Sequence, residues 1–251
     1  MPLQTRHVRV TSGVRKPWSA ARDLCAMLLV LCVVSSVRAQ TDSARHTSDP
    51  NAFRLFLAPT SVTLPENHGT IQLAEIVVPT VNYGIIDELI VRGGITPFAV
   101  SSHVLYYGLA GLQVFDYDGF SGVGGVAFTN ATGNERSWES ALYGFGVVGY
   151  TAKDFGIYGG LGGGYSGKRE SSTAIFMLGG EYAISAHNKL ITENWFISET
   201  RTNAYSIGIR AYGTVLSFDL GVMGISASHS LKITNVVPWV ALSYHFDLSE
   251  E

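Results

Sequence analysis

After its first fifty residues, the chain alternates between apolar and polar positions in short segments that turn residues separate. In the closing segment, Leu242, Tyr244 and Phe246 fall on one face of an extended chain. Ser243 and His245 fall on the opposite face. A two-residue period in pieces of roughly ten residues is typical of the strands of an outer-membrane β-barrel. The pattern therefore predicts an all-β protein with one apolar and one mixed face.

The segments predict about twelve strands, an even number, as an antiparallel barrel of this kind requires. They span 52–58, 69–82, 88–96, 104–115, 120–128, 136–150, 155–165, 172–184, 190–198, 203–212, 215–224 and 236–248. The expected fold is an antiparallel up-and-down transmembrane β-barrel. We expect the last strand, which ends at Phe246, to close the barrel against the first at Arg54-Leu55-Phe56.

The connections between these segments fall into two classes. Every second one is tight, at 84–87, 116–119, 152–154, 185–189 and 213–214. The others are longer, at 59–68, 97–103, 129–135, 166–171 and 225–235, with 199–202 as a short exception. Outer-membrane barrels have short periplasmic turns and longer external loops. The alternation therefore predicts that both ends of the barrel chain are periplasmic.

The N-terminal segment reads as an export signal. Basic residues from Arg6 to Arg22 precede an apolar run, Leu24 to Val34, and the small-residue pattern of Val37-Arg38-Ala39 follows. This order is that of a secretory signal peptide, with cleavage after Ala39. The apolar run is too short for a helix that spans about 30 Å of hydrocarbon. Met27 is an alternative start to Met1.

The predicted cleavage changes the composition of the chain. Both cysteines, Cys25 and Cys32, leave with residues 1–39, so the mature chain has no disulfide and no thiolate site. Six of the 17 basic and one of the 20 acidic residues leave as well, which gives 11 against 19 and a net charge of −8. That balance disfavours nucleic acid as a partner. Residues 40–51 then form a flexible periplasmic leader, and residues 52–248 form the barrel.

Charged residues on the mixed faces are candidates for lining the lumen, where charge tunes selectivity. They are Arg92, Glu181, Arg210 and Asp219. A hairpin at 213–214 places Arg210 opposite Ser217, with Asp219 as the diagonal neighbour on the same face. Diagonal partners lie within reach of a long side chain. We therefore predict a contact between Arg210 and Asp219.

Motifs that would carry catalysis are weak by comparison. Gly144 to Gly149 matches G-x-G-x-x-G, but a dinucleotide site needs these glycines between a strand and a helix, not inside a strand. Ser101-Ser102-His103 and Ser226 to Ser230 with His229 show only proximity in sequence, whereas a triad needs a base oriented by a third group. The remaining histidines have no metal-ligand spacing. The sequence assigns no catalytic, cofactor or metal residue and favours a protein without enzymatic activity.

The opening of the barrel region resembles a known group of proteins. Arg54-Leu55-Phe56-Leu57-Ala58-Pro59-Thr60, the later Tyr83-Gly84-Ile85-Ile86-Asp87 and the Pro-started last strand are similar to uncharacterised outer-membrane β-barrel families of Gram-negative bacteria. The resemblance covers most of residues 52–246. It implies a barrel in the outer membrane and brings no activity or catalytic residue.

The expected function is that of an outer-membrane β-barrel in contact with lipid, with a structural role or a passive pore for small solutes. One alternative is a lipid-modifying hydrolase with its serines and histidines at the outer rim. A second alternative is a soluble exported β-barrel that binds a small apolar ligand. The low content of charged residues, 15%, disfavours a soluble outer face.

Overall fold

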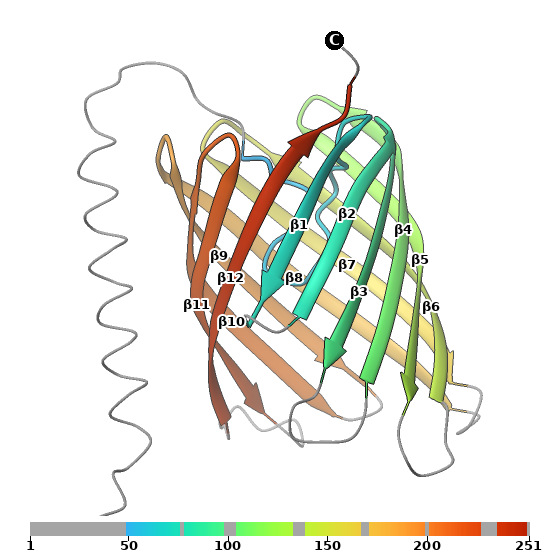
Figure 1. The fold of residues 1–251 in the computed structure, drawn as a ribbon. Coiled ribbons are helices and arrows are strands. Elements are labelled where there is room, and N and C mark those ends of the chain that lie inside the picture. Colours follow the sequence, from blue (N-terminus) through green and yellow to red (C-terminus); the bar gives the residue numbers. More distant parts are fainter. Residues whose placement is uncertain are drawn as a thin grey trace, which may run out of the picture. The chain divides into compact units, whose positions relative to one another are not determined.

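The computed structural model describes residues 49–75, 78–97, 104–132, 139–166, 171–198, 201–226 and 235–249. It is a closed barrel of twelve antiparallel strands in which each strand pairs with its neighbours in the chain and β1 pairs with β12 (Figure 1). The strands are β1 (His68–Ala74), β2 (Val78–Ile86), β3 (Leu89–Pro97), β4 (Val104–Tyr117), β5 (Phe120–Thr132), β6 (Glu139–Thr151), β7 (Phe155–Ser166), β8 (Ser171–Ser185), β9 (Asn188–Ile197), β10 (Thr202–Tyr212), β11 (Leu216–Ser226) and β12 (Asn235–Asp247). No helix among these residues is long and apolar enough to cross a membrane.

The strands keep the two-faced pattern of the sequence, but with the apolar side chains outward. On β12, Leu242 and Tyr244 are 47% and 49% exposed, whereas Ser243 between them is 1% exposed. On β8, Phe176, Leu178 and other large apolar side chains are likewise exposed. A soluble domain rarely exposes contiguous apolar area on this scale. The wall therefore has an apolar exterior, and its polar side chains face the lumen.

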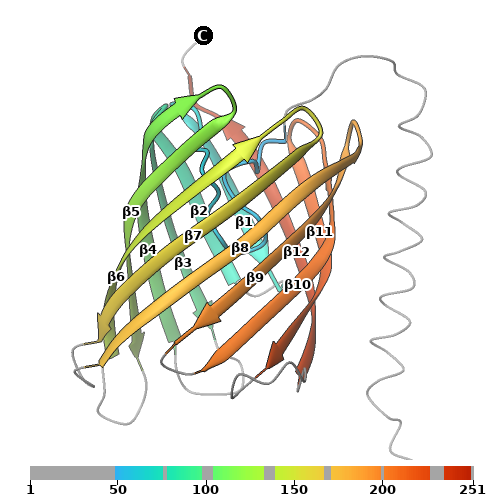
Figure 2. The same ribbon diagram turned by 180° about the vertical axis from the view of Figure 1, so that it is seen from behind.

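The two ends of the barrel differ. At one end, here called the turn end, residues 87–88, 118–119, 152–154, 186–187 and 213–215 join successive strands. The last strand also ends there, because Asp247 pairs with His68 at the start of β1. The opposite end is called the loop end. Figure 2 shows the steeply tilted strands β5 to β10 that connect the two ends on the far side.

The prediction of a first wall strand at 52–58 was wrong. Phe53, Arg54, Leu55 and Phe56 are all buried in succession, which a wall strand with one lipid face and one lumen face cannot satisfy. The segment instead folds back on itself, since Thr60 N donates to Phe53 O at 3.0 Å. The pairing that closes the barrel is therefore between β12 and β1, not between β12 and Arg54-Leu55-Phe56.

The predicted long strand at 69–82 is two strands, β1 and β2. The chain reverses after Ala74, where Glu75 has a positive φ of 51°. The twelve-strand total is thus correct because one strand was added at 52–58 and another was missed here. The expected long connection at 59–68 does not join two wall strands, and the barrel begins at His68 rather than at residue 52.

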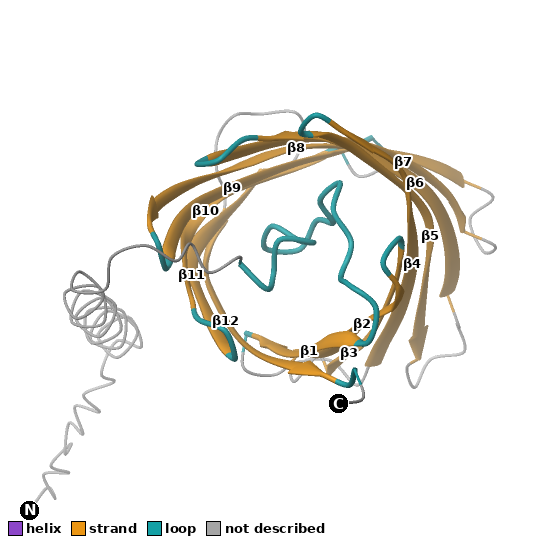
Figure 3. Cartoon of the chain, turned by 90° about the horizontal axis from the view of Figure 1, so that it is seen from above, coloured by secondary structure: helices purple, strands orange, loops and turns teal. Residues whose placement is uncertain are grey.

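Residues 49–67, here called the plug, lie inside the ring of strands (Figure 3). The described end of the predicted leader belongs to it, because Asn51 is fully buried. Wall glycines leave space for the plug. A Cβ atom on Gly84 would overlap the backbone carbonyls of Leu64 and Pro65, and one on Gly179 would overlap the Leu55 side chain. The wall and the plug are therefore fitted to each other.

We predict that Gly84→Ala destabilises the protein by about 1–3 kcal/mol, because the clash is with plug backbone that cannot move away cheaply. The free energy of unfolding in urea, measured in detergent micelles, checks this. Gly146→Ala is the control, since a Cβ there meets nothing within 4 Å. Equal effects of the two substitutions would contradict a fitted plug.

Candidate functional site: a plugged lumen

Arg210 is the centre of the contacts between wall and plug. Its Nε donates to Asp219 Oδ1 at 2.6 Å, and the two residues face each other across the β10–β11 pair. Its Nη1 and Nη2 atoms donate to three plug carbonyl oxygens, those of Asn51, Arg54 and Leu55, at 2.6–3.1 Å. The guanidinium presents five donors in a rigid fork, which suits this simultaneous recognition of carboxylate and backbone.

Arg54 ties the plug to the same carboxylate from the other side. Its Nη1 lies 2.9 Å from Asp219 Oδ2, and its Nη2 donates to Ser243 Oγ at 3.0 Å. Burial and the nearby Arg210 lower the pKa of Arg54 to about 10, so the group remains charged at neutral pH. Asp219 therefore bridges one arginine of the plug and one arginine of the wall.

Asp49 extends the network toward the turn ends of β8 and β9. Its carboxylate pairs with Arg210 and with Lys189, and Lys189 Nζ lies 2.7 Å from Glu181 Oε2. Burial alone would raise the pKa of Asp49, but Arg210 and Lys189 together lower it to about 2. Three cations and three carboxylates thus alternate in one connected chain from Arg54 to Glu181. Such balance is what makes buried charge tolerable.

Glu193 on β9 binds the backbone of the plug directly. Its Oε2 accepts hydrogen bonds from the N–H groups of Phe56, Leu57 and Ala58, at 2.8, 2.9 and 3.1 Å. Its Oε1 accepts one from Trp195 Nε1. Three successive N–H groups that point at one oxygen form a ready-made anion site. In a wall strand, these N–H groups would donate to carbonyl oxygens of a neighbouring strand. Here the fully buried carboxylate of Glu193 takes the place of those carbonyl oxygens.

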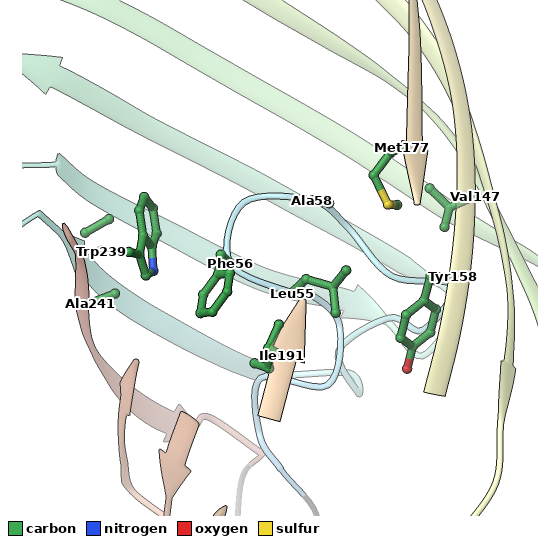
Figure 4. Close-up of a cluster of buried hydrophobic side chains, with 10 residues drawn as sticks. Leu55, Phe56, Ala58, Val147, Tyr158, Met177, Ile191, Trp239 and Ala241 are labelled. Carbon is green, nitrogen blue, oxygen red and sulfur yellow. The ribbon is translucent and has the colours of Figure 1, made fainter. Parts of the chain in front are cut away.

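Apolar packing completes the attachment. Leu55 and Phe56 pack inside the lumen against Ile191 of β9 and Trp239 of β12 (Figure 4). The ring centroids of Phe56 and Trp239 are 6.0 Å apart. Leu55 and Ile191 are both fully buried. On the far side of the plug, Arg92 donates to Leu57 O at 3.0 Å and lies over the Phe53 ring. The part of the plug from residue 49 to residue 58 is therefore held by charge, hydrogen bonds and packing together.

The part of the plug at 59–63 is held less strongly and is here called the latch. Ser61 Oγ lies 2.7 Å from Ser121 Oγ on β5. Thr63 Oγ1 donates to Asp87 O, and it lies 2.9 Å from Gln113 Oε1. These are neutral hydrogen bonds, each worth about 0.5–1.5 kcal/mol net. The latch thus joins the opposite wall of the barrel by contacts that can break at modest cost.

A cavity lies on each side of the latch. The loop-end cavity, of about 320 Å³, reaches the plug at Pro59 and is otherwise lined by side chains and backbone of β4 to β9. The turn-end cavity, of about 500 Å³, reaches the plug at Val62, Thr63 and Pro65 and the wall near Asp87 and Asp116. The two ends of the latch therefore line different cavities, with Pro59 at one and Val62 and Thr63 at the other.

The four residues predicted to line the lumen all lie on inward faces of their strands, and the structure brings three of them into one network. The predicted contact between Arg210 and Asp219 is confirmed. The register differs by two residues, since Arg210 is opposite Asp219 and Ser217 is opposite Tyr212. Glu181 joins them through Lys189 and Asp49, whereas Arg92 lies apart. A role of these charges in selectivity remains a prediction.

Sequence reasoning missed Asp49, Arg54, Lys189 and Glu193. One of them carried a usable signal: Arg54 interrupts an otherwise apolar segment, where an unpaired charge would be costly. Asp49 was assigned to the leader, and its partner Arg210 is more than 150 residues away in the sequence. Nothing local could have joined those two.

Serine and histidine do meet once in the lumen. Ser217 Oγ lies 3.2 Å from His245 Nε2, and Asn51 Nδ2 donates to the same hydroxyl. The other ring nitrogen, Nδ1, is buried without a hydrogen-bond partner among the described residues. A triad requires a third group at that nitrogen. The rim residues 101–103 and 227–230 lie outside the described residues, and no three metal-ligating side chains converge within the described part.

Comparison with known proteins places the fold among porins. The KdgM porin in complex with disordered oligogalacturonate superposes with a TM-score of 0.53, at 9% sequence identity over 71% of this chain and 98% of that chain. The likeness shows a shared fold. The KdgM porin alone gives 0.49 over the same shares, and the anion-selective porin from Comamonas acidovorans gives 0.38 at 10% identity, over 67% of this chain and 59% of that chain. No family model and no curated protein matches the chain.

We predict that Arg210→Met lowers the free energy of unfolding by about 3–5 kcal/mol, because it leaves Asp49 and Asp219 buried beside fewer cations. The urea midpoint at neutral pH measures the effect. Lys153→Met, at an exposed turn, is the matched loss of a positive charge and should change stability by less than about 0.5 kcal/mol. A small effect of Arg210→Met would show that the network does not hold the plug.

The lowered pKa of Asp49 predicts an acid-dependent contribution to stability. A depressed folded-state pKa stabilises the protein above the ordinary value of 3.8, and this contribution disappears as the pH falls through about 2. Wild type should therefore exceed Asp49→Asn in stability at pH 7, and the difference should shrink at pH 2. Urea titrations of both proteins at the two pH values measure it. A difference that stays constant would contradict the assigned pairing.

Proposed function

We propose that the chain is an outer-membrane β-barrel that gives small molecules a passive route past a displaceable latch. The observation that carries the proposal is the pair of cavities toward opposite ends of the lumen, one lined by Pro59 and the other by Val62 and Thr63 of the same plug segment. Movement of this short segment toward the strongly held part of the plug would join the two spaces. The shared fold with a porin supports this reading.

The membrane location rests on the exterior of the wall. Large apolar side chains such as Leu161, Leu178 and Val222 are exposed on β7, β8 and β11, and such a face is matched by hydrocarbon, not by water. The export signal predicted at 1–39 would deliver the chain to the periplasm. With both ends of the barrel chain in the periplasm, the turn end faces the periplasm, and the plug enters the barrel from that side.

The width of the barrel explains why a plug accompanies the pore. Eight strands enclose a lumen that side chains can fill, whereas 16–18 strands leave an open aqueous channel. A barrel of twelve strands lies between these limits, and the plug occupies space that the wall side chains do not reach. The ionic network fixes 49–58, so the latch can move without release of the whole segment.

A disulfide between latch and wall tests the proposal. Ser61 and Ser121 are hydrogen-bonded through their side chains, so Ser61→Cys with Ser121→Cys places two thiols within bonding distance. Purified protein in planar lipid bilayers should conduct. We expect conductance of the double variant to fall several-fold on oxidation and to recover with dithiothreitol.

The single variant Ser61→Cys controls for the loss of the hydroxyl and should not respond to oxidation. Absence of conductance in both the wild type and the reduced double variant would overturn the pore. Conductance that the disulfide leaves unchanged would overturn the role of the latch.

A further inference from the structure

We propose that the loop-end cavity is a binding site for a small uncharged apolar molecule. The inference deepens the proposed function, because it names the class of molecule that the lumen admits. The cavity measures about 320 Å³ and lies beside Pro59 of the plug, in the half of the barrel formed by β4 to β9. It is thus distinct from the ionic network around Arg210.

The lining of the cavity is almost entirely apolar. Leu109, Phe145, Val147, Met177 and Trp195 contribute side chains from four different strands. Thr129 supplies a hydroxyl. The indole N–H of Trp195 is already engaged by Glu193. A ligand would therefore meet hydrocarbon, sulfur and aromatic surface, which is the usual composition of small-molecule sites.

The space is built into the wall by its glycines. Gly160 and Gly162 on β7 face the cavity, and a Cβ on Gly160 would lie 3.2 Å from Met177 Cε and 3.3 Å from Val147 Cγ2. Larger residues at these positions would fill the space from the wall side. Protein interiors are normally packed to few voids larger than a water molecule. An apolar hollow of this size, lined by glycine in the middle of a strand, is suited to an occupant.

The size and polarity limit that occupant. An apolar cavity of about 150 Å³ in another protein stays dry and binds benzene. Twice that volume suits a molecule of about eight to twelve non-hydrogen atoms by the same comparison. A charged group on the ligand would lose its hydration and find no partner of opposite charge in the cavity. The lumen cations Arg54, Arg210 and Lys189 are already paired with carboxylates. The site therefore favours an uncharged ligand.

Two probes of equal chain length test the inference by quenching of Trp195 fluorescence. The probes are 1-bromooctane and 8-bromooctanoate, which differ in the carboxylate and carry bromine as the quencher. In the detergent-solubilised full barrel, we expect saturable quenching by 1-bromooctane. Quenching by 8-bromooctanoate should require at least about tenfold more probe, because burial of its carboxylate costs more than the 1.4 kcal/mol that corresponds to a factor of ten.

Ala127→Leu fills the cavity from β5 and should abolish saturable quenching. Ala110→Leu is the matched control, because Ala110 lies on the neighbouring strand β4 and has the opposite, outward orientation. Trp195→Phe should remove the part of the quenching that arises at the cavity, and it serves if Ala127→Leu does not fold.

Quenching that is linear in probe and equal in Ala127→Leu and Ala110→Leu would mean partition into the micelle and would overturn the site. Equal affinity for the two probes would overturn the uncharged class. The measurement involves no transport, so it separates the two proposals. Saturable binding without conductance would support the binding site and overturn the pore. Conductance without saturable binding would support the pore and overturn the binding site.

Discussion

The structure depends on the pairing of a buried carboxylate, Asp219, with two arginines that come from opposite sides of it. Arg210 belongs to the wall and Arg54 to the plug. Removal of either arginine would leave the buried carboxylate of Asp219 with one cation fewer, and an unpaired buried ion costs several kcal/mol. The plug is therefore not an accessory that fills the barrel after it forms. Arg54 of the plug pairs with the wall carboxylate Asp219. In turn, wall side chains provide hydrogen-bond partners for the backbone of the plug.

The division of the lumen follows from this arrangement. The charged groups gather on β8 to β11, where Lys189, Glu193 and Arg210 face the plug. The opposite half carries glycine and apolar residues, and it contacts the plug through the latch, through Arg92 and beside Gly84. A segment that is fixed along one wall and weakly joined to the other can pivot without breaking its ionic contacts. Under the proposed function, this asymmetry places the passage on the side of the latch.

The sequence predicted most of the wall, because alternation is a local property that each strand displays by itself. The strand predicted at 155–165 is observed as Phe155–Ser166, and that at 203–212 as Thr202–Tyr212. Alternation could not distinguish a wall strand from a hairpin inside the lumen, so 52–58 was misassigned. The contact of Arg210 with Asp219 survived an incorrect register, because a shift by two residues keeps every side chain on its face.

The plug could not be predicted because its partners are distant in sequence and its apolar residues imitate a strand. A stricter physical criterion would have found it. In a wall strand, Leu55 and Phe56 would point to opposite faces, so one of them would point into the lumen. The arginine at the preceding position would also need a buried partner. The wall offers that partner in Asp219, whose Oδ2 accepts hydrogen bonds from both Arg210 and Arg54. The need of Arg54 for a buried partner, rather than the strand pattern, therefore identifies the segment that enters the barrel.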